Sequence, residues 1–62
     1  MKIDQILDII LGLSRSQGFY GRLYESLMIE KESNPENWKM IVETLEGQDF
    51  KDPVDVVLYF ET

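Results

Sequence analysis

Apolar and polar positions alternate with the period of an α-helix along most of this chain. In the first such stretch the apolar side chains recur every three or four residues, at Ile3, Ile6, Leu7, Ile10, Leu11 and Leu13. This spacing places them on one face of a helix, with the polar side chains on the other. The pattern therefore predicts an amphipathic helix that begins near residue 3.

The end of this first helix has two interpretations. Gly12 can terminate it in a left-handed conformation, with a new helix starting at Ser14. Alternatively, the helix continues to about Ser16 and breaks just before Gly18. We favour the second interpretation, because the first places both Gly18 and Gly21 inside a helix, where each costs roughly 1 kcal/mol relative to alanine.

A second helical pattern starts at Phe19 and ends near Ser33. Its apolar face comprises Phe19, Tyr20, Leu23, Tyr24, Leu27 and Met28. Asn34-Pro35 then marks the start of a third helix, because an asparagine side chain can cap a helix and proline is favoured at the first helical position. Glu36 is well placed in the first turn of that helix.

The third helix is expected to end at Gly47, since glycine is common at the C-terminal end of helices. Its predicted buried face comprises Trp38, Ile41, Val42 and Leu45. Residues 48–51 are predicted to form a loop.

Asp52-Pro53 repeats the start signal and predicts a short fourth helix. Its expected apolar side comprises Val54, Val57, Leu58 and Phe60. Residues 54–60 are also rich in β-branched and aromatic side chains, so a strand is the alternative. We favour the helix, because a lone strand would have no partner elsewhere in the chain unless two chains paired their C-termini.

These elements predict an all-α fold, a small compact bundle of three to four short helices that forms a single helical domain over residues 1–62. A chain of this length buries only about 60% of the surface that its unfolded form exposes. It has no Cys and no His, so disulfides, thiolate metal sites and imidazole chemistry are excluded. Small folds without such cross-links need well-packed helices or a partner chain, so a homodimer is one option.

Charge narrows the classes of partner. The net charge is −6, which disfavours direct binding to nucleic acid or to an anionic membrane surface. Residues 1–24 carry +1 and residues 25–62, with ten acids and three lysines, carry −7. Acidic residues near the N-terminus argue against a signal peptide. No uncharged stretch of the chain is long enough to cross a bilayer. We therefore expect a cytoplasmic protein without membrane partners.

The least helix-like stretch is 16–24, where two glycines, three aromatic rings and an arginine fall together. In one interpretation Gly18 and Gly21 let two helices approach closely, and the rings fill the core beside Trp38. In the other, some rings are exposed next to the arginine and form a docking surface for a protein, since these residue types are enriched in binding hot spots. The candidate partner-binding residues are Phe19, Tyr20, Arg22 and Tyr24.

No pattern in the chain predicts catalysis, a cofactor, a metal or a small-molecule ligand. The spacing Gly18-x-x-Gly21-Arg22 matches neither the P-loop nor the dinucleotide-binding fingerprint. The acidic pairs lack the ligand order of a calcium-binding loop, and a domain this small has little room for a glycosidase cleft. Without His or Cys, an enzyme would need a perturbed carboxylate or lysine in a cleft. We therefore expect a protein that is not an enzyme.

The acidic second half supports an alternative function. Its carboxylates could imitate the phosphate rows of DNA and block the basic groove of a nucleic-acid-binding protein. The residues concerned are Glu36, Glu43, Glu46, Asp49, Asp52 and Asp55.

Two sequence blocks, residues 16–23 (SQGFYGRL) and residues 50–61 (FKDPVDVVLYFE), resemble a group of short uncharacterised proteins encoded by bacterial phages, prophages and conjugative elements. The resemblance covers most of the chain and implies no activity for any residue. It implies a mobile-element setting, in which proteins directed at host proteins, including inhibitors of defence nucleases, are common. Together with the composition, it predicts a small acidic module that binds another protein, with inhibition through a DNA-like acidic surface as the alternative.

Overall fold

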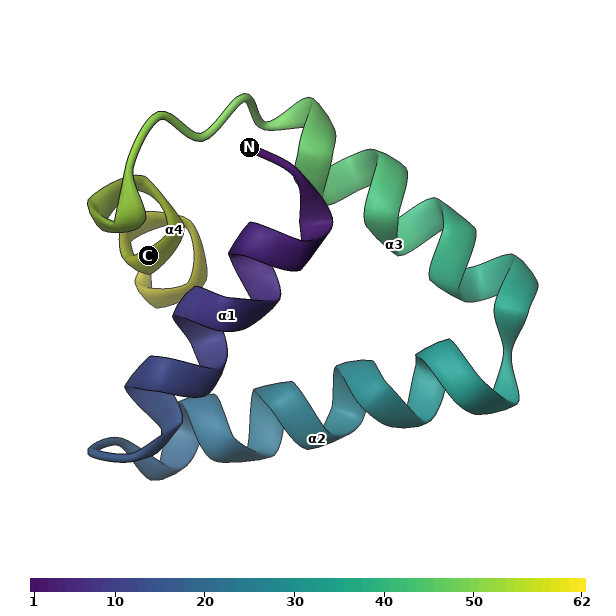
Figure 1. Ribbon diagram of the computed structural model, residues 1–62, viewed down its shortest axis with the longest axis horizontal. Helices are drawn as coiled ribbons and strands as arrows, with labels where there is room; N and C mark the ends of the chain where they lie inside the picture. Colours follow the sequence, from purple (N-terminus) through teal and green to yellow (C-terminus); the bar gives the residue numbers. More distant parts are fainter.

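The computed structural model describes residues 1–62 and contains four α-helices joined by short turns (Figure 1). They are α1 (Ile3–Ser14), α2 (Gly18–Ser33), α3 (Pro35–Gly47) and α4 (Pro53–Glu61). No residue lies in a strand, so the all-α prediction is confirmed and the strand alternative for residues 54–60 is wrong.

The first two helices break where the favoured interpretation placed the break. Gly12 lies inside α1, and the chain turns at residues 15 and 16 before Gln17 adopts an extended conformation as the N-cap of α2. Gly21 nevertheless lies inside α2, so part of the cost that we assigned to the rejected interpretation is present in this fold.

Gly21 does not create a close approach of two helices. A methyl group added there would lie 3.9 Å from the Ser14 Cβ, which is an ordinary van der Waals distance. At Gly18 the nearest contact of such a methyl would be the flexible Arg22 guanidinium, at 3.6 Å. The glycine-mediated helix contact that we considered is therefore not present.

The two proline start signals act as predicted. The Asn34 side chain accepts a hydrogen bond from the Asn37 backbone N–H at 3.4 Å, and Pro35 opens α3. Asp52 accepts from the Val54 N–H at 3.0 Å, and Pro53 opens α4. Both helices therefore begin at caps encoded by neighbouring residues.

The start of α1 is capped from a distant part of the chain. The Ile3 backbone N–H donates to Glu46 Oε2 at 2.9 Å, across 43 residues of sequence. The carboxylate of Glu46 on α3 thus satisfies one of the N–H groups that a helix start leaves unpaired, and its charge suits the positive end of the helix dipole.

The predicted end of α3 at Gly47 is confirmed. Gly47 is the last residue of α3, but no glycine in the chain has a positive φ. The left-handed residue is Asp49, with φ of 56°. Aspartate tolerates this conformation better than most residues, so the left-handed turn lies in the loop, two residues after the end of α3.

The helix α1 lies across the middle of the molecule and contacts each of the other three helices, whereas α4 packs its backbone against α1 alone (Figure 1). The buried core has eight residues: Ile6, Leu7, Ile10, Tyr20, Leu27, Leu45, Phe50 and Val56. Of the predicted buried face of α3, only Leu45 is fully buried, while Trp38, Ile41 and Val42 are half-buried.

The predicted apolar side of α4 is wrong for two of its four residues, while Val57 and Phe60 are half-buried as expected of that side. Val56 is completely buried, whereas Val54 and Leu58 expose 61% and 55% of their surface. All these side chains are apolar, so the local pattern does not mark the buried side, and the position of α1 decides it.

Candidate functional site

The four residues predicted to bind a partner do not share one surface. Tyr20 is completely buried, and Tyr24 is half-buried against the core. Phe19 exposes 46% of its surface, and Arg22 is also exposed. The burial of Tyr20 removes its ring from any surface that the folded chain presents, so Phe19, Arg22 and the exposed part of Tyr24 remain open to a partner from this group.

Tyr20 instead connects α2 to the end of α4. Its hydroxyl donates a hydrogen bond to Glu61 Oε2 at 2.5 Å, and its ring meets the Phe19 ring edge-on at a centroid distance of 5.1 Å. Burial, together with the hydrogen bond to the Glu61 carboxylate and its negative charge, raises the pKa of Tyr20 to about 12. The phenol therefore stays protonated and keeps this link intact at neutral pH.

Phe19 lines a hollow beside this link. The hollow has a volume of about 270 Å³ and is lined by Gln17, Phe19, Phe60 and Glu61. It lies where the start of α2 meets the end of α4.

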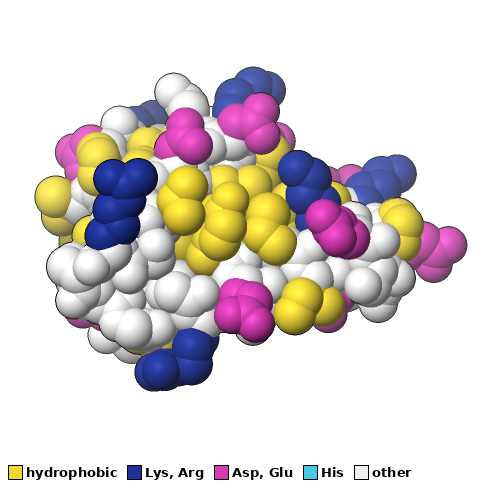
Figure 2. Space-filling view, turned by 60° about the horizontal axis from the view of Figure 1, so that its bottom comes forward, with side chains coloured by type: hydrophobic (Ala, Val, Ile, Leu, Met, Phe, Trp, Pro, Cys, Tyr) yellow, Lys and Arg dark blue, Asp and Glu magenta, His cyan; other side chains and the backbone are white.

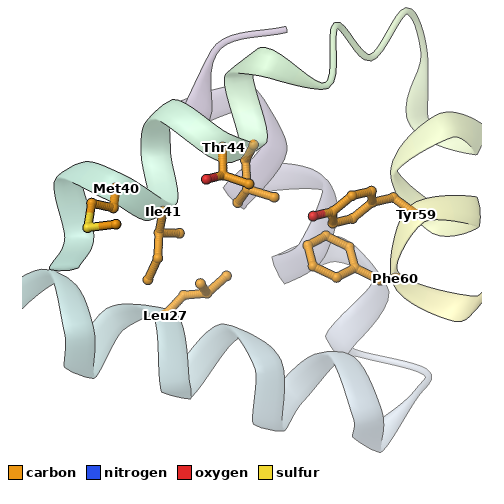
Figure 3. Close-up of a pocket in the computed structure, with 7 residues that line it drawn as sticks. Leu27, Met40, Ile41, Thr44, Tyr59 and Phe60 are labelled. Carbon is orange, nitrogen blue, oxygen red and sulfur yellow. The ribbon is translucent and has the colours of Figure 1, made fainter.

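A second and almost wholly apolar groove lies between α2, α3 and α4, and we call it the three-helix groove. It is open, with a volume of about 260 Å³, and is lined by Leu27, Met40, Ile41, Thr44, Leu45, Tyr59 and Phe60. Figure 3 shows Tyr59 and Phe60 extending from α4 towards the space where Ile41 of α3 and Leu27 of α2 approach each other, with Met40 at the end of the groove beyond Ile41.

The three-helix groove exists because α3 and α4 do not pack against each other. Both helices contact α1 instead, so the space between α3 and α4 stays open on one side. Apolar side chains that would otherwise form a helix interface therefore remain accessible, and Met40 exposes 66% of its surface. This feature was missed in the sequence, where Met40 was not counted among the apolar positions of α3.

The α4 side of the groove is held in place by aromatic contacts. The Tyr59 ring meets Phe50 at a centroid distance of 5.5 Å and Phe60 at 5.1 Å, both edge to face. Because Phe50 is buried in the core, these contacts position Tyr59 without any bound partner.

Phe60 lines both hollows. The three-helix groove includes Met40 on α3 and the aromatic residues of α4, and the other hollow includes Phe19 on α2. In the space-filling view, hydrophobic side chains gather in the middle of the molecule, with charged side chains of both signs around them (Figure 2).

Acidic side chains dominate the border of the three-helix groove. Glu36 and Glu43 lie four residues before and three residues after Met40, so helical geometry places them beside it on α3. By the same spacing Asp55 lies beside Tyr59 on α4. On α2, Lys31 lies one turn beyond the lining residue Leu27. Its neighbour Glu30 accepts a hydrogen bond from Asn37 Nδ2 at 2.6 Å.

Several of the acids proposed to imitate DNA already have intramolecular partners. Glu46 caps α1, Asp52 caps α4, and Asp55 accepts from the Lys51 backbone N–H at 2.8 Å. Asp49 forms an ion pair with Lys51 at 3.0 Å, which lowers the pKa of its carboxyl group. From that set, Glu36 and Glu43 are exposed and have no such contact.

The chemistry of the groove suits contact and not proton transfer. Its lining contains no Asp, Glu, Lys or Arg, and its polar groups are the hydroxyls of Thr44 and Tyr59. No three acidic side chains gather in an arrangement that could hold a metal ion. None of the four helices combines the length and the apolar character needed to cross a membrane.

Comparisons with protein-family models, with curated proteins and with solved structures each find no match to this chain. The resemblance to proteins of phages and other mobile elements therefore stays a prediction, and the geometry alone supports the functional argument.

Proposed function

We propose that this protein is a small acidic interaction module that binds another protein through the three-helix groove. The observation that carries the proposal is an open apolar groove of about 260 Å³ in a chain with only eight buried residues. Exposed apolar surface of this kind, gathered in one hollow, is typical of protein interaction sites.

The size and lining of the groove favour a macromolecular partner over a small molecule. Small-molecule sites usually enclose about 300–1,000 Å³ and include a few converging polar groups. This groove is open, falls below that range and converges no charged side chains. Side chains of a partner protein could fill it and bury Met40 and Tyr59, which expose 66% and 39% of their surface.

The acidic surface is proposed to select the partner by charge, and it does not support a separate DNA-like function. Four of the six acids in that set serve helix caps or an ion pair within the chain. Their positions therefore follow from the needs of the fold. Charges around the groove would still speed association with a basic partner and disfavour acidic ones.

Affinity capture from the native host tests the proposal when two variants are compared with the wild type. Met40→Glu places a charge at the edge of the groove, and Ile29→Glu places one elsewhere on α2, at a position with a similar exposed fraction of 55%. We expect the wild type and Ile29→Glu to retain a common partner and Met40→Glu to lose it. Equal retention of that partner by Met40→Glu would contradict the proposal.

A further inference from the structure

We propose that the occupant of the three-helix groove is an amphipathic α-helix with basic side chains beside its apolar face. This inference rests on the proposed docking function and specifies the chemistry of the partner. Three features of the molecule support it: the lack of a free backbone edge, the two hollows that share Phe60 and the charge of the groove border.

The groove offers a ligand no backbone to pair with. Its walls are three α-helices, whose N–H and C=O groups are used within each helix, and the chain contains no strand. One common mode of extended-peptide binding adds a strand to a sheet edge, which this fold does not provide. Binding must therefore come from side chains that enter the hollows, and a helix presents such side chains in a row.

The two hollows can accept more than one apolar side chain of a bound helix. The three-helix groove and the hollow beside Phe19 share the lining residue Phe60. The molecule measures 28 × 24 × 19 Å, and a helix of about 14 residues is roughly 21 Å long. A helix of that length therefore matches the dimensions of the molecule, and it places apolar side chains at spacings of three, four and seven residues.

The acidic border of the groove indicates that the bound helix carries basic side chains beside its apolar face. The groove-lining residues all belong to residues 25–62, a segment with a net charge of −7. Glu36 and Glu43 border Met40 and have no intramolecular partner, while Glu61 lines the second hollow. Lys31 is the basic residue one turn from the lining residue Leu27. A helix with Lys or Arg beside its apolar stripe would therefore meet an excess of negative charge.

The same charges disfavour a second copy of this chain as the occupant. Each copy has a net charge of −6, so two facing grooves would bring like charges together. The chain also lacks a complementary helix to insert, because its six basic residues are scattered: α2 carries two of them, α3 carries one, and Lys2, Arg15 and Lys51 lie outside the helices.

Selection from a display library of helical peptides tests the inference. The probe is a library of peptides of about 14 residues, with an apolar stripe at helical spacing and all other positions randomised without charge bias. Peptides are selected on the wild-type protein and counter-selected on Met40→Glu. We expect the enriched peptides to carry an excess of Lys and Arg, and replacing those residues by Glu to weaken binding about tenfold or more at low salt.

Reversing the charge of two pairs of glutamates on the protein provides a matched control for the effect of the peptide's basic residues. The double variant Glu36→Lys/Glu43→Lys should restore binding of the Glu-substituted peptide, because it reverses the charge of the groove border. The double variant Glu25→Lys/Glu32→Lys changes the net charge equally, at exposed positions of α2 outside the lining, and should not restore it. Equal effects of the two pairs would overturn the inference.

The outcomes separate this inference from the proposed function. Peptides that depend on Met40 but lack basic residues would overturn the basic helix and leave the docking function standing. If every peptide that binds the wild type also binds Met40→Glu, so that the counter-selection leaves none, both would be overturned. A wild-type dimer that Met40→Glu converts to a monomer would show that the occupant is a second copy, and would also overturn the inference.

Discussion

At the scale of single residues, two side chains that sequence reasoning assigned to a surface stabilise the fold instead. Tyr20 lies in the core and links α2 to Glu61 on α4, while Glu46 caps the first helix from the third. Sequence reasoning treated the tyrosine as a candidate contact for a partner and the glutamate as part of a charged surface. Their actual partners are 41 and 43 residues away, which no local pattern specifies.

Replacing Tyr20 tests the pH dependence of that link. The folded-state pKa of about 12 lies above the usual value of 10.0, so the stability from the protonated phenol is present below pH 10 and lost as the pH rises through 12. We expect Tyr20→Phe to lower the free energy of unfolding by about 1 kcal/mol at pH 8, through loss of the hydrogen bond. Urea denaturation at a series of pH values should show the difference between the two proteins vanish between pH 10 and pH 12. A difference that does not change with pH would contradict this account.

Replacing Glu46 tests the cap on α1. Glu46→Ala leaves the Ile3 N–H without its partner and should cost about 1 kcal/mol of unfolding free energy in urea denaturation. Glu43→Ala removes an exposed carboxylate one turn earlier on the same helix, so it is the matched control and should change stability little. Equal losses in the two variants would mean that the acidic charge of α3, and not the cap, is what stabilises the fold.

At the scale of elements, predictions from local signals succeeded and predictions that depend on packing failed. Asn34-Pro35 and Asp52-Pro53 mark the starts of α3 and α4 correctly, because a cap and its helix are neighbours in sequence. The buried side of α4 was assigned wrongly, since it depends on which helix lies against it. The three-helix groove could not be predicted for the same reason, as it results from two helices that do not meet.

The glycines within helices provide a test at this scale. A methyl group at Gly12 would have no heavy atom within 4 Å, and one at Gly21 would meet only ordinary contacts. Both Gly12→Ala and Gly21→Ala should therefore raise the free energy of unfolding by up to about 1 kcal/mol, measured by thermal or urea denaturation. Destabilisation by Gly21→Ala alone would show that α1 and α2 need the glycine to approach each other.

At the scale of the whole molecule, a small core and an open apolar groove are two consequences of one arrangement. The helix α1 contacts the three other helices, so the fold closes around it while the space between α3 and α4 stays open. The chain thus presents a preformed apolar surface with an acidic border. Composition alone indicated the acidity and the absence of imidazole and thiol chemistry, but the place where a partner would dock depends on the three-dimensional arrangement.

The most direct test of the docking function is site-specific photo-crosslinking in the native host. One variant carries a photoreactive amino acid in place of Thr44, inside the three-helix groove, and the other carries it in place of Ile29, an exposed position of α2 that does not line the groove. We predict that the Thr44 position crosslinks to a distinct partner protein through a helical segment of that partner, and that the Ile29 position does not. A partner that crosslinks from Ile29 and not from Thr44 would contradict the account.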